Sequence, residues 1–327
     1  MTATAELPTI WFDRHPLPVI RDLLEGRATI VSIEAGSSVL SGIELADGIV
    51  AGAAIRYNRS VFDQAPRLRV ICRAGIGYDN LDLDDAAELG IAACNAPDAP
   101  TVSTSEQAMG LILAITKGLR ESQARLERQE GNYFAHHMHL ELNGSTLALI
   151  GVGRIGGRVS GMAKAMGMDV VAYDPYQPDQ RFTDLGVRRA PTLAAAVDGA
   201  HVVSVHAPLS AETHHLVDAA LIEQMMDGVY LVNTARGGLV DDAALIEALD
   251  RGKVRAAGLD VTDPEPLPGG HPLLGRDDIV VTPHVASATG AGARRIFEHA
   301  CEIVLATLAG NRPASLLNPS AWPGRNR

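Results

Sequence analysis

Three side chains that can bind acids or move protons stand just after apolar runs of the chain. Arg236 follows the run 229–233, His284 follows the run 278–282, and Glu265 lies in the loop between them. An arginine binds carboxylates, and a histidine beside a carboxylate can donate a proton. If the runs are parallel strands, their carboxyl ends meet at one sheet edge, where open α/β sheets bind ligands. We therefore interpret the three residues as one catalytic site, although each alone could be a surface arginine, a solvated carboxylate or a turn histidine.

A glycine-rich stretch earlier in the chain predicts a dinucleotide site. Gly151, Gly153 and Gly156 follow the apolar run 146–150 and open a helical pattern in the order G-x-G-x-x-G. The first glycine permits a tight turn, the second lets a pyrophosphate approach the backbone, and the third lets the helix pack close to the strand. Asp174 ends the next apolar run, where a carboxylate can accept hydrogen bonds from both hydroxyls of the adenosine ribose.

The carboxylate of Asp174 indicates which dinucleotide is bound. It would repel a 2′-phosphate, so the stretch favours NAD over NADP. Tyr176 and Arg181 lie nearby in the sequence and leave a tolerance of NADP open. The simpler alternative is a glycine-rich turn beside an acidic loop, but the strand, helix and second strand around the glycines favour the dinucleotide.

Short apolar runs alternate with helical patterns, which predicts an α/β protein with parallel sheets. The runs predicted as strands are 29–33, 48–53, 69–75, 146–150, 169–173, 201–205, 229–233, 256–261 and 278–282. Two long helices are predicted over 103–128 and 287–309, and a shorter helix begins at Asp241 or Asp242 and ends near Gly252. If the C-terminal tail rejoins a first domain of about a hundred residues, the long helices are the two crossings between domains.

The composition excludes several classes of function. The 327 residues include 28 Lys and Arg against 39 Asp and Glu, a net charge of −11 that argues against binding to nucleic acid or an anionic membrane. No apolar run is long enough to span a membrane, and the N-terminus shows no signal-peptide pattern. Cys72, Cys94 and Cys301 are interpreted as buried apolar side chains in a reducing compartment, so we expect a cytoplasmic protein.

In combination, these motifs resemble the D-isomer-specific 2-hydroxyacid dehydrogenase family from about residue 45 to about residue 315. The stretches that carry the resemblance are RAGIGYDNLD (73–82), GVGRIG (151–156) with Asp174, VHAPLSAETHHL (205–216), NTARGG (233–238), LDVTDPEPLP (259–268) and TPHVASAT (282–289). The resemblance implies two doubly wound parallel-sheet domains. A Rossmann domain that binds NAD (104–289) is inserted in a flavodoxin-like substrate domain (1–103 plus 290–327).

The resemblance also implies a role for each catalytic candidate. Arg236 binds the substrate's carboxylate and carbonyl, His284 is the acid/base, and Glu265 is its partner. The two glycines after Arg236 are expected to leave room for the substrate and the nicotinamide. These residue types suit the reduction of a 2-oxo acid, in which a hydride reaches carbon and a proton reaches oxygen. A carboxylate beside a histidine stabilises the protonated ring, and a guanidinium stabilises the developing alkoxide.

Further contacts follow from the resemblance. The backbone N–H groups of Gly75, Ile76 and Gly77 form a second clamp on the substrate carboxylate, and Asp260 hydrogen-bonds the carboxamide of the nicotinamide. The contacts expected for NAD are Gly151, Gly153, Arg154, Ile155, Gly156, Asp174, His206, Ala207, Pro208, Thr213, Thr234, Ala235, Arg236, Asp260 and His284.

Other histidines offer alternatives. His271 follows Glu265 closely and is a rival base, although its Gly-Gly and Pro neighbours indicate a loop. A metal site could be imagined at His136, His137 and His139, but no acidic or cysteine ligand lies at a suitable spacing, so no metal is predicted. In the family that the chain resembles, the stretch 105–145 contributes to dimerisation, and we expect a homodimer.

The identity of the substrate stays open. Phosphoglycerate dehydrogenase-like members commonly carry an arginine where this chain has Gly52, and Arg56 or Arg59 could compensate from the next turn. A phosphorylated substrate is therefore not favoured, and the expected partner is a small 2-oxo or 2-hydroxy acid. The alternative from another class is an NAD(H)-sensing, corepressor-like binding module without significant turnover.

Overall fold

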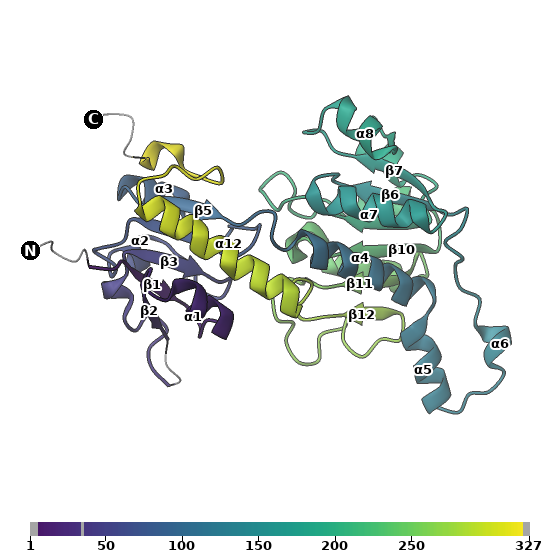
Figure 1. The fold of residues 1–327 in the computed structure, drawn as a ribbon. Coiled ribbons are helices and arrows are strands. Elements are labelled where there is room, and N and C mark those ends of the chain that lie inside the picture. Colours follow the sequence, from purple (N-terminus) through teal and green to yellow (C-terminus); the bar gives the residue numbers. More distant parts are fainter. Residues whose placement is uncertain (1–5, 34–35, 323–327) are drawn as a thin grey trace, which may run out of the picture. The chain divides into compact units, whose positions relative to one another are not determined.

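The structure is a computed structural model that describes residues 6–33 and 36–322. The chain folds into two compact units, unit 1 (Met1–Pro100 and Thr289–Arg327) and unit 2 (Thr101–Ala288). Each unit is built on one parallel sheet with helices beside it, so the predicted α/β fold class is confirmed (Figure 1). The domain boundaries expected from the sequence fall at 103/104 and 289/290. In the structure the boundaries between the two units along the chain fall at 100/101 and 288/289.

Unit 1 contains a five-stranded parallel sheet in the order β2-β1-β3-β4-β5. Its strands are β1 (Thr9–Phe12), β2 (Thr29–Ser32), β3 (Gly48–Ala51), β4 (Val70–Arg73) and β5 (Ala92–Asn95). Its α-helices are α1 (Pro18–Leu24), α2 (Arg59–Phe62), α3 (Leu83–Glu88) and α12 (Gly290–Leu308). One core lies between the sheet and helices α1 and α12, and a second core lies on the side of α2 and α3.

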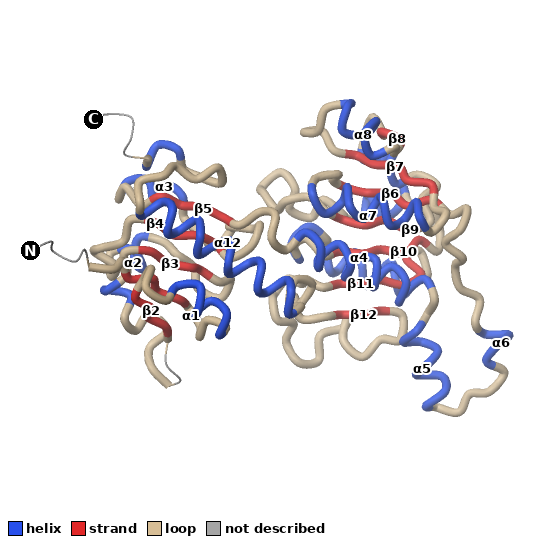
Figure 2. Tube along the Cα trace, viewed as in Figure 1, coloured by secondary structure: helices blue, strands red, loops and turns tan. Residues whose placement is uncertain are grey.

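Unit 2 contains a seven-stranded parallel sheet in the order β12-β11-β10-β9-β6-β7-β8. Its strands are β6 (Thr146–Ile150), β7 (Asp169–Tyr173), β8 (Arg188–Arg189), β9 (Val202–Val205), β10 (Val229–Asn233), β11 (Val254–Leu259) and β12 (Ile279–Val281). Its α-helices are α4 (Thr101–Thr116), α5 (Leu119–Glu127), α6 (Tyr133–His136), α7 (Arg154–Ala165), α8 (Asp179–Leu185), α9 (Leu193–Val197), α10 (Ala219–Gln224) and α11 (Asp242–Asp250). Helices α4 and α7 lie side by side over the strands (Figure 2).

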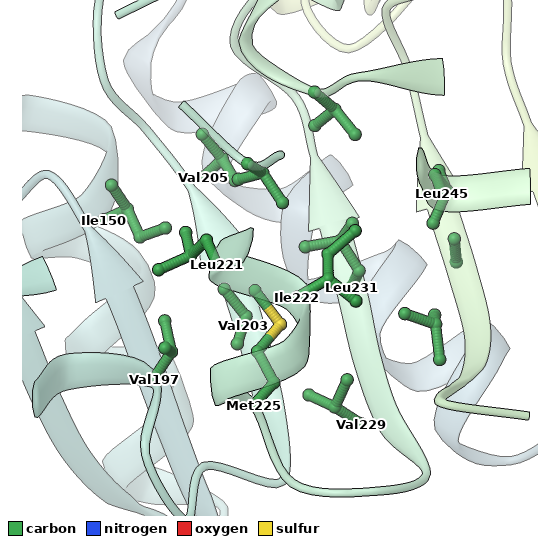
Figure 3. Close-up of a cluster of buried hydrophobic side chains, with 14 of the residues drawn as sticks. Ile150, Val197, Val203, Val205, Leu221, Ile222, Met225, Val229, Leu231 and Leu245 are labelled. Atoms are coloured by element: carbon green, nitrogen blue, oxygen red, sulfur yellow. The ribbon is translucent and has the colours of Figure 1, made fainter. Parts of the chain in front are cut away.

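The strands of unit 2 are apolar on both faces because both faces are covered. Along β10, Val229 and Leu231 belong to the core that includes α10 and α11, whereas Tyr230 and Val232 belong to the core under α4 and α7. Successive side chains of a strand point to opposite faces, and a sheet buried on both sides therefore needs a continuous apolar run. Figure 3 shows the first of these cores, with Leu231 of β10 beside Ile222 of α10.

The helix predicted over 103–128 is interrupted, so that prediction is wrong in one respect. Helix α4 ends at Thr116 and α5 begins at Leu119. Between them Gly118 has a φ of +54°, a left-handed conformation that glycine adopts without strain. The ring of His139 packs against Gly118, where a Cβ would overlap it. Leu119, the first residue of α5, is 59% exposed.

Two other expectations, the N-cap of one helix and the burial of the cysteines, are confirmed. The N-cap of α11 is Asp241, whose Oδ1 accepts hydrogen bonds from the N–H groups of Ala243 and Ala244. All three cysteines are buried with free thiols. Among residues 6–33 and 36–322, no helix combines the length and the apolar character that a membrane crossing requires.

Candidate active site

The candidate residues of unit 2 follow the carboxyl ends of its strands. The order of the strands along the sheet reverses between β6 and β9. Strands β7 and β8 lie on one side of this pair, and β10, β11 and β12 lie on the other. Ligands of open α/β sheets bind outside the carboxyl ends at such a reversal. The residues that follow these strand ends are Gly151 after β6, Asp174 after β7, His206 after β9, Arg236 after β10, Asp260 after β11 and His284 after β12.

The three glycines after β6 have the distinct conformations and surroundings that the motif predicts. Gly151 has a φ of +98°, and a Cβ there would lie 2.8 Å from the carbonyl oxygen of His206. A Cβ on Gly156 would overlap the carbonyl oxygen of Gly151, so only glycine lets α7 approach β6 this closely. A Cβ on Gly153 would meet nothing within 4 Å. The space beside Gly153, at the N-terminus of α7, suits an anionic group such as a pyrophosphate.

Asp174 and Arg181 hold the backbone of this glycine loop. The carboxylate of Asp174 accepts hydrogen bonds from the N–H groups of Val152 and Tyr176, both at 3.0 Å. From α8, Arg181 donates Nε–H to the carbonyl of Val152 at 3.0 Å and a terminal N–H to the carbonyl of Gly153 at 2.8 Å. The guanidinium of Arg181 is therefore bound to the loop itself, which weakens the case for a 2′-phosphate partner at this position.

The residues that follow β9 lie next to the glycine loop. The His206 N–H donates to the carbonyl of Ile150 at 2.7 Å, and its Nε2 lies 2.9 Å from the hydroxyl of Ser204. Burial lowers the pKa of His206 to about 4, so this ring is neutral at neutral pH. The Thr213 hydroxyl donates to the carbonyl of Pro208 at 2.7 Å, which folds the predicted cofactor loop back on itself.

The turn after β10 is held by the buried side chain of Asn233. Its amide nitrogen donates to the carbonyl of Arg236 at 2.7 Å, and its amide oxygen accepts from the N–H of Ala235 at 3.0 Å. These two bonds place the half-buried Arg236 at the sheet edge, as expected. The explanation offered for the following glycine is wrong, because a Cβ on Gly237 would overlap the backbone of Thr262. Gly237 makes room for the protein's own backbone, not for a ligand.

Thr234 presents a polar atom that the protein leaves unsatisfied. Its side chain is buried with 6% exposure, and its hydroxyl has no hydrogen-bond partner within the part of the chain that the structure describes. Burying a hydroxyl without a partner is unfavourable. A bound molecule at this strand end would supply the missing partner, in agreement with the prediction that Thr234 contacts a cofactor.

Asp260 is the most deeply buried carboxylate of the site, with no exposed surface. Its Oδ1 accepts hydrogen bonds from the Thr282 hydroxyl at 2.6 Å and the Val285 N–H at 3.0 Å, and its Oδ2 accepts from the Ala286 N–H at 2.9 Å. The backbone carbonyl of Asp260 also accepts from the His284 N–H at 2.7 Å. Four bonds thus join the end of β11 to residues 282–286, the loop that carries His284.

His284 and Glu265 form a direct pair. Nδ1 of His284 lies 2.6 Å from Oε1 of Glu265, and both side chains are about a third exposed, at 31% and 39%. A carboxylate only accepts hydrogen bonds, so Nδ1 must donate, and Nε2 is the ring atom left to exchange a proton. His284 has a φ of +54°, an uncommon conformation for a residue with a side chain, which the bonds to Asp260 maintain.

The alternative histidines have different partners. Nε2 of His271 lies 4.0 Å from the Asp242 carboxylate, so the rival base is not the one that pairs with Glu265. The ring of His139 lies 3.5 Å from the Glu121 carboxylate and packs against His137. Among the described residues, no group of three His, Cys, Asp or Glu side chains is arranged to hold a metal ion.

The predicted substrate clamp lies in unit 1, after β4. Gly75 has a φ of +147°, which favours glycine, and its carbonyl accepts the N–H of Ala96 at 2.9 Å. The side chain of Asn95, at the end of β5, donates to the carbonyl of Ile76 at 2.7 Å. These bonds hold the loop of Gly75, Ile76 and Gly77 at the carboxyl edge of the sheet of unit 1.

Three supporting residues were not predicted from the sequence: Asn233, Thr282 and Arg181. Asn233 and Thr282 are polar residues at the ends of apolar runs, a signal that could have been used. Arg181 was noted only for its effect on a 2′-phosphate.

Comparisons with known proteins found relatives over most of this chain. The family model for the NAD-binding domain of the D-isomer-specific 2-hydroxyacid dehydrogenases matches residues 109–286. D-3-phosphoglycerate dehydrogenase of Methanocaldococcus jannaschii is 38% identical over 86% of this chain and 53% of its own length. Hydroxypyruvate reductase of Thermotoga maritima is 40% identical over 76% of this chain and 81% of its own length. The chain spans about half the length of the phosphoglycerate dehydrogenases that it matches.

A solved structure shows the same architecture with ligands. The structure of D-lactate dehydrogenase from Aquifex aeolicus, complexed with NAD and lactic acid, matches with a TM-score of 0.82 at 28% identity. The match covers 93% of this chain and 96% of that one.

The glycine loop gives a first test, because Gly153 and Gly156 should respond differently to alanine. Gly153→Ala fits the protein and should leave the melting temperature unchanged, yet its methyl group would occupy the pyrophosphate space and weaken NADH binding at least about tenfold. Gly156→Ala should lower both the melting temperature and the affinity, because its methyl group overlaps the protein backbone. Calorimetry and thermal unfolding would measure the two effects. Wild-type NADH affinity in Gly153→Ala would show that the loop does not hold the pyrophosphate.

Asp260 gives a second test. Asp260→Asn places an amide N–H₂ beside an N–H or hydroxyl donor of the 282–286 loop, so a hydrogen bond is lost. This should lower the free energy of unfolding by about 1–3 kcal/mol. We expect faster hydrogen exchange at Val285 and Ala286 and a lower melting temperature. Asp169→Asn, an exposed change at the opposite edge of the same sheet, is the matched control. Unchanged exchange in the loop of Asp260→Asn would contradict the assigned role.

Proposed function

The chain belongs to the D-isomer-specific 2-hydroxyacid dehydrogenase family, and from this premise we propose that it reduces a small 2-oxo acid to the D-2-hydroxy acid with NADH, or runs the reverse reaction. The observation that carries the proposal is the pair of His284 and Glu265, joined at 2.6 Å at the same sheet edge as the glycine loop and Arg236. A binding site alone would not need a histidine held in one tautomer by a carboxylate.

The residues of this chain divide the work of the reduction. The guanidinium of Arg236 binds the substrate carboxylate and stabilises negative charge that develops on the carbonyl oxygen. Nε2 of His284 gives its proton to that oxygen, and Glu265 accepts the hydrogen bond of Nδ1–H and so fixes the orientation of the ring. In the oxidative direction the same nitrogen takes the proton back from the hydroxyl group.

The residues of unit 2 fit a bound NAD. The space at Gly153 and the N-terminus of α7 would hold the pyrophosphate, Asp174 would bind the adenosine ribose, and the unsatisfied hydroxyl of Thr234 would find a partner. When bound, the nicotinamide supplies or accepts the hydride. The further contacts expected at Arg154, Ile155, His206, Ala207, Pro208, Thr213 and Ala235 belong to the same proposal.

Asp260 is proposed to act in two ways. Its carboxylate accepts three bonds from residues 282–286 and so positions the loop of His284. Its Oδ2 accepts only one of them and keeps a lone pair for the carboxamide of the nicotinamide, the partner implied by the resemblance.

The division of labour between the two parts of the chain is also a proposal. Residues 104–289 would bind NAD, and residues 1–103 plus 290–327 would bind the substrate, with the backbone of Gly75, Ile76 and Gly77 as a second clamp on its carboxylate. A cytoplasmic location remains a prediction from the sequence.

Turnover tests the proposed function directly. NADH oxidation at 340 nm would be followed with glyoxylate, hydroxypyruvate, pyruvate, phenylpyruvate and 3-phosphohydroxypyruvate. We expect turnover of at least one, and a loss of about 10²- to 10⁴-fold in kcat in His284→Ala, which removes the proton donor. His271→Ala, the matched control, should keep its activity. Tight NADH binding without turnover of any compound would instead support the NAD(H)-sensing module.

We propose a homodimer formed through the segment of α5 and α6. Large apolar side chains are exposed along it: Leu119 (59%), Leu126 (56%), Phe134 (94%) and Met138 (79%). Grouped apolar side chains at a surface are typical of an interface, and a second copy of the chain would cover them.

Sedimentation velocity tests this assembly. Phe134→Glu places a charge among the exposed apolar side chains, and we expect it to convert the dimer to a monomer. Tyr176→Glu changes an aromatic residue with 80% exposure elsewhere in unit 2, and should leave the dimer intact. A wild-type protein that sediments as a monomer, or a Phe134→Glu variant that remains a dimer, would contradict the proposed interface.

A further inference from the structure

The sheet of unit 1 has its own reversal point, between β1 and β3. In the order β2-β1-β3-β4-β5, β2 lies on one side of β1, whereas β3 and the later strands lie on the other. A crevice for ligands forms outside the carboxyl ends of the two strands where the direction changes. Those ends are followed by Asp13 and Arg14 after β1, and by Gly52 after β3.

Asp13 joins the two strand ends and orients Arg14. Its side chain is 2% exposed, and its Oδ2 accepts the N–H of Gly52 at 2.7 Å. Its Oδ1 accepts Nε–H of Arg14 at 3.0 Å. From α12, the ring of Phe297 lies 5.9 Å from the guanidinium carbon of Arg14, near enough for a cation–π contact.

The guanidinium of Arg14 occupies the space that a side chain at residue 52 would fill. A Cβ on Gly52 would overlap a terminal nitrogen of Arg14 and the Oδ2 of Asp13. The absence of a side chain at Gly52 therefore does not leave this strand end without a cation. A guanidinium reaches it from the neighbouring strand instead, with half of the Arg14 side chain open to solvent.

The surroundings of Arg14 favour an anion. The phenol oxygen of Tyr57 is buried and has no hydrogen-bond partner within the described part of the chain. Burial raises the pKa of Tyr57, so it remains a neutral O–H donor, and the charges of Asp13, Arg14 and Arg73 all act on it. The unused donor of Tyr57 thus lies within the electrostatic reach of the Asp13–Arg14 pair. The terminal nitrogens of Arg14 have no protein acceptor among the described residues.

One of the two arginines that could compensate for Gly52, Arg59, is bound elsewhere. Arg59, at the start of α2, pairs with Asp63 at 2.9 Å and with Glu88 at 3.2 Å. Its guanidinium is therefore held by carboxylates of α2 and α3, and it does not compensate for Gly52.

We propose that Arg14 is a specificity-determining residue that binds an anionic group at the non-reacting end of the substrate. The preferred substrate is then a 2-oxo acid with a second negative charge, carried by a phosphate or a second carboxylate. This inference rests on the proposed function, which makes the loop of Gly75, Ile76 and Gly77 in the same unit a clamp on the reacting carboxylate. It revises the expectation, based on Gly52, that a phosphorylated substrate is not favoured.

The test compares kcat/KM for substrates with one and with two anionic groups. Glyoxylate and hydroxypyruvate are the first kind; 3-phosphohydroxypyruvate and 2-oxoglutarate are the second. Wild-type protein should prefer a substrate with two anionic groups, and the better of the two identifies phosphate or carboxylate as the group that is bound. Arg14→Gln should lower kcat/KM for it by about 10- to 100-fold, as expected for a lost charge-assisted hydrogen bond, and change glyoxylate by less than about threefold.

Two further variants sharpen the comparison. Arg14→Lys keeps the charge and should recover part of the preference. Arg67→Gln removes one positive charge at the opposite edge of the same sheet, where Arg67 pairs with Asp47, and should leave the preference unchanged. Equal losses of kcat/KM in Arg14→Gln for substrates with one and with two anionic groups, or no loss for either, would overturn the inference. Turnover of glyoxylate would still support the proposed function in that case.

A binding measurement separates the two failures. If neither these four substrates nor pyruvate nor phenylpyruvate is reduced, the proposed function fails, and calorimetry with NAD-loaded protein then decides the role of Arg14. 3-Phosphoglycerate should bind the wild type at least about tenfold more tightly than Arg14→Gln, while glycolate binds both alike. Equal affinity of 3-phosphoglycerate for both proteins would overturn the inference.

Discussion

The candidate site depends on one buried carboxylate. Asp260 has no exposed surface, yet its oxygens accept three hydrogen bonds from residues 282–286, and its carbonyl accepts a fourth from the N–H of His284. A buried carboxylate is tolerated only when such donors satisfy it, and the same donors then lose their freedom to move. Because they belong to the loop after β12, His284 is held in an uncommon backbone conformation with Nδ1 against Glu265.

Hydrogen-bonded polar side chains also lie at other strand ends of both units. Asn233 closes the turn that presents Arg236, Asp174 and Arg181 hold the glycine loop, and Asp13 joins β1 to β3 beneath Arg14. In each case a polar side chain at the end of a buried strand satisfies loop backbone or a neighbouring cation, and a functional group is presented beside it. The parallel sheets supply the position, since all their strands end at the same edge, and these side chains supply the orientation.

The sequence predicted the parts whose physical signal is local. Apolar runs such as 229–233 predicted strands, and the spacing of Gly151, Gly153 and Gly156 predicted a loop whose steric needs the structure reproduces. Strand β5, with the sequence AACN, carries no β-branched residue and was missed. The helix break at Gly118 leaves room for the ring of His139, which packs against it. Residue 237 must be glycine because the backbone of Thr262 lies against it. Such contacts join distant segments, so the sequence pattern around each residue contains no sign of them.

The most direct test of the account is a crystal structure of the protein with NADH and a non-reacting analogue of a 2-oxo acid. The account predicts that the guanidinium of Arg236 binds the analogue's carboxylate. It also predicts that Nε2 of His284 lies about 3 Å from the oxygen at the keto position, with Nδ1 still bonded to Glu265. An analogue bound with that oxygen facing His271 or solvent, or a His284 ring turned away from Glu265, would contradict it.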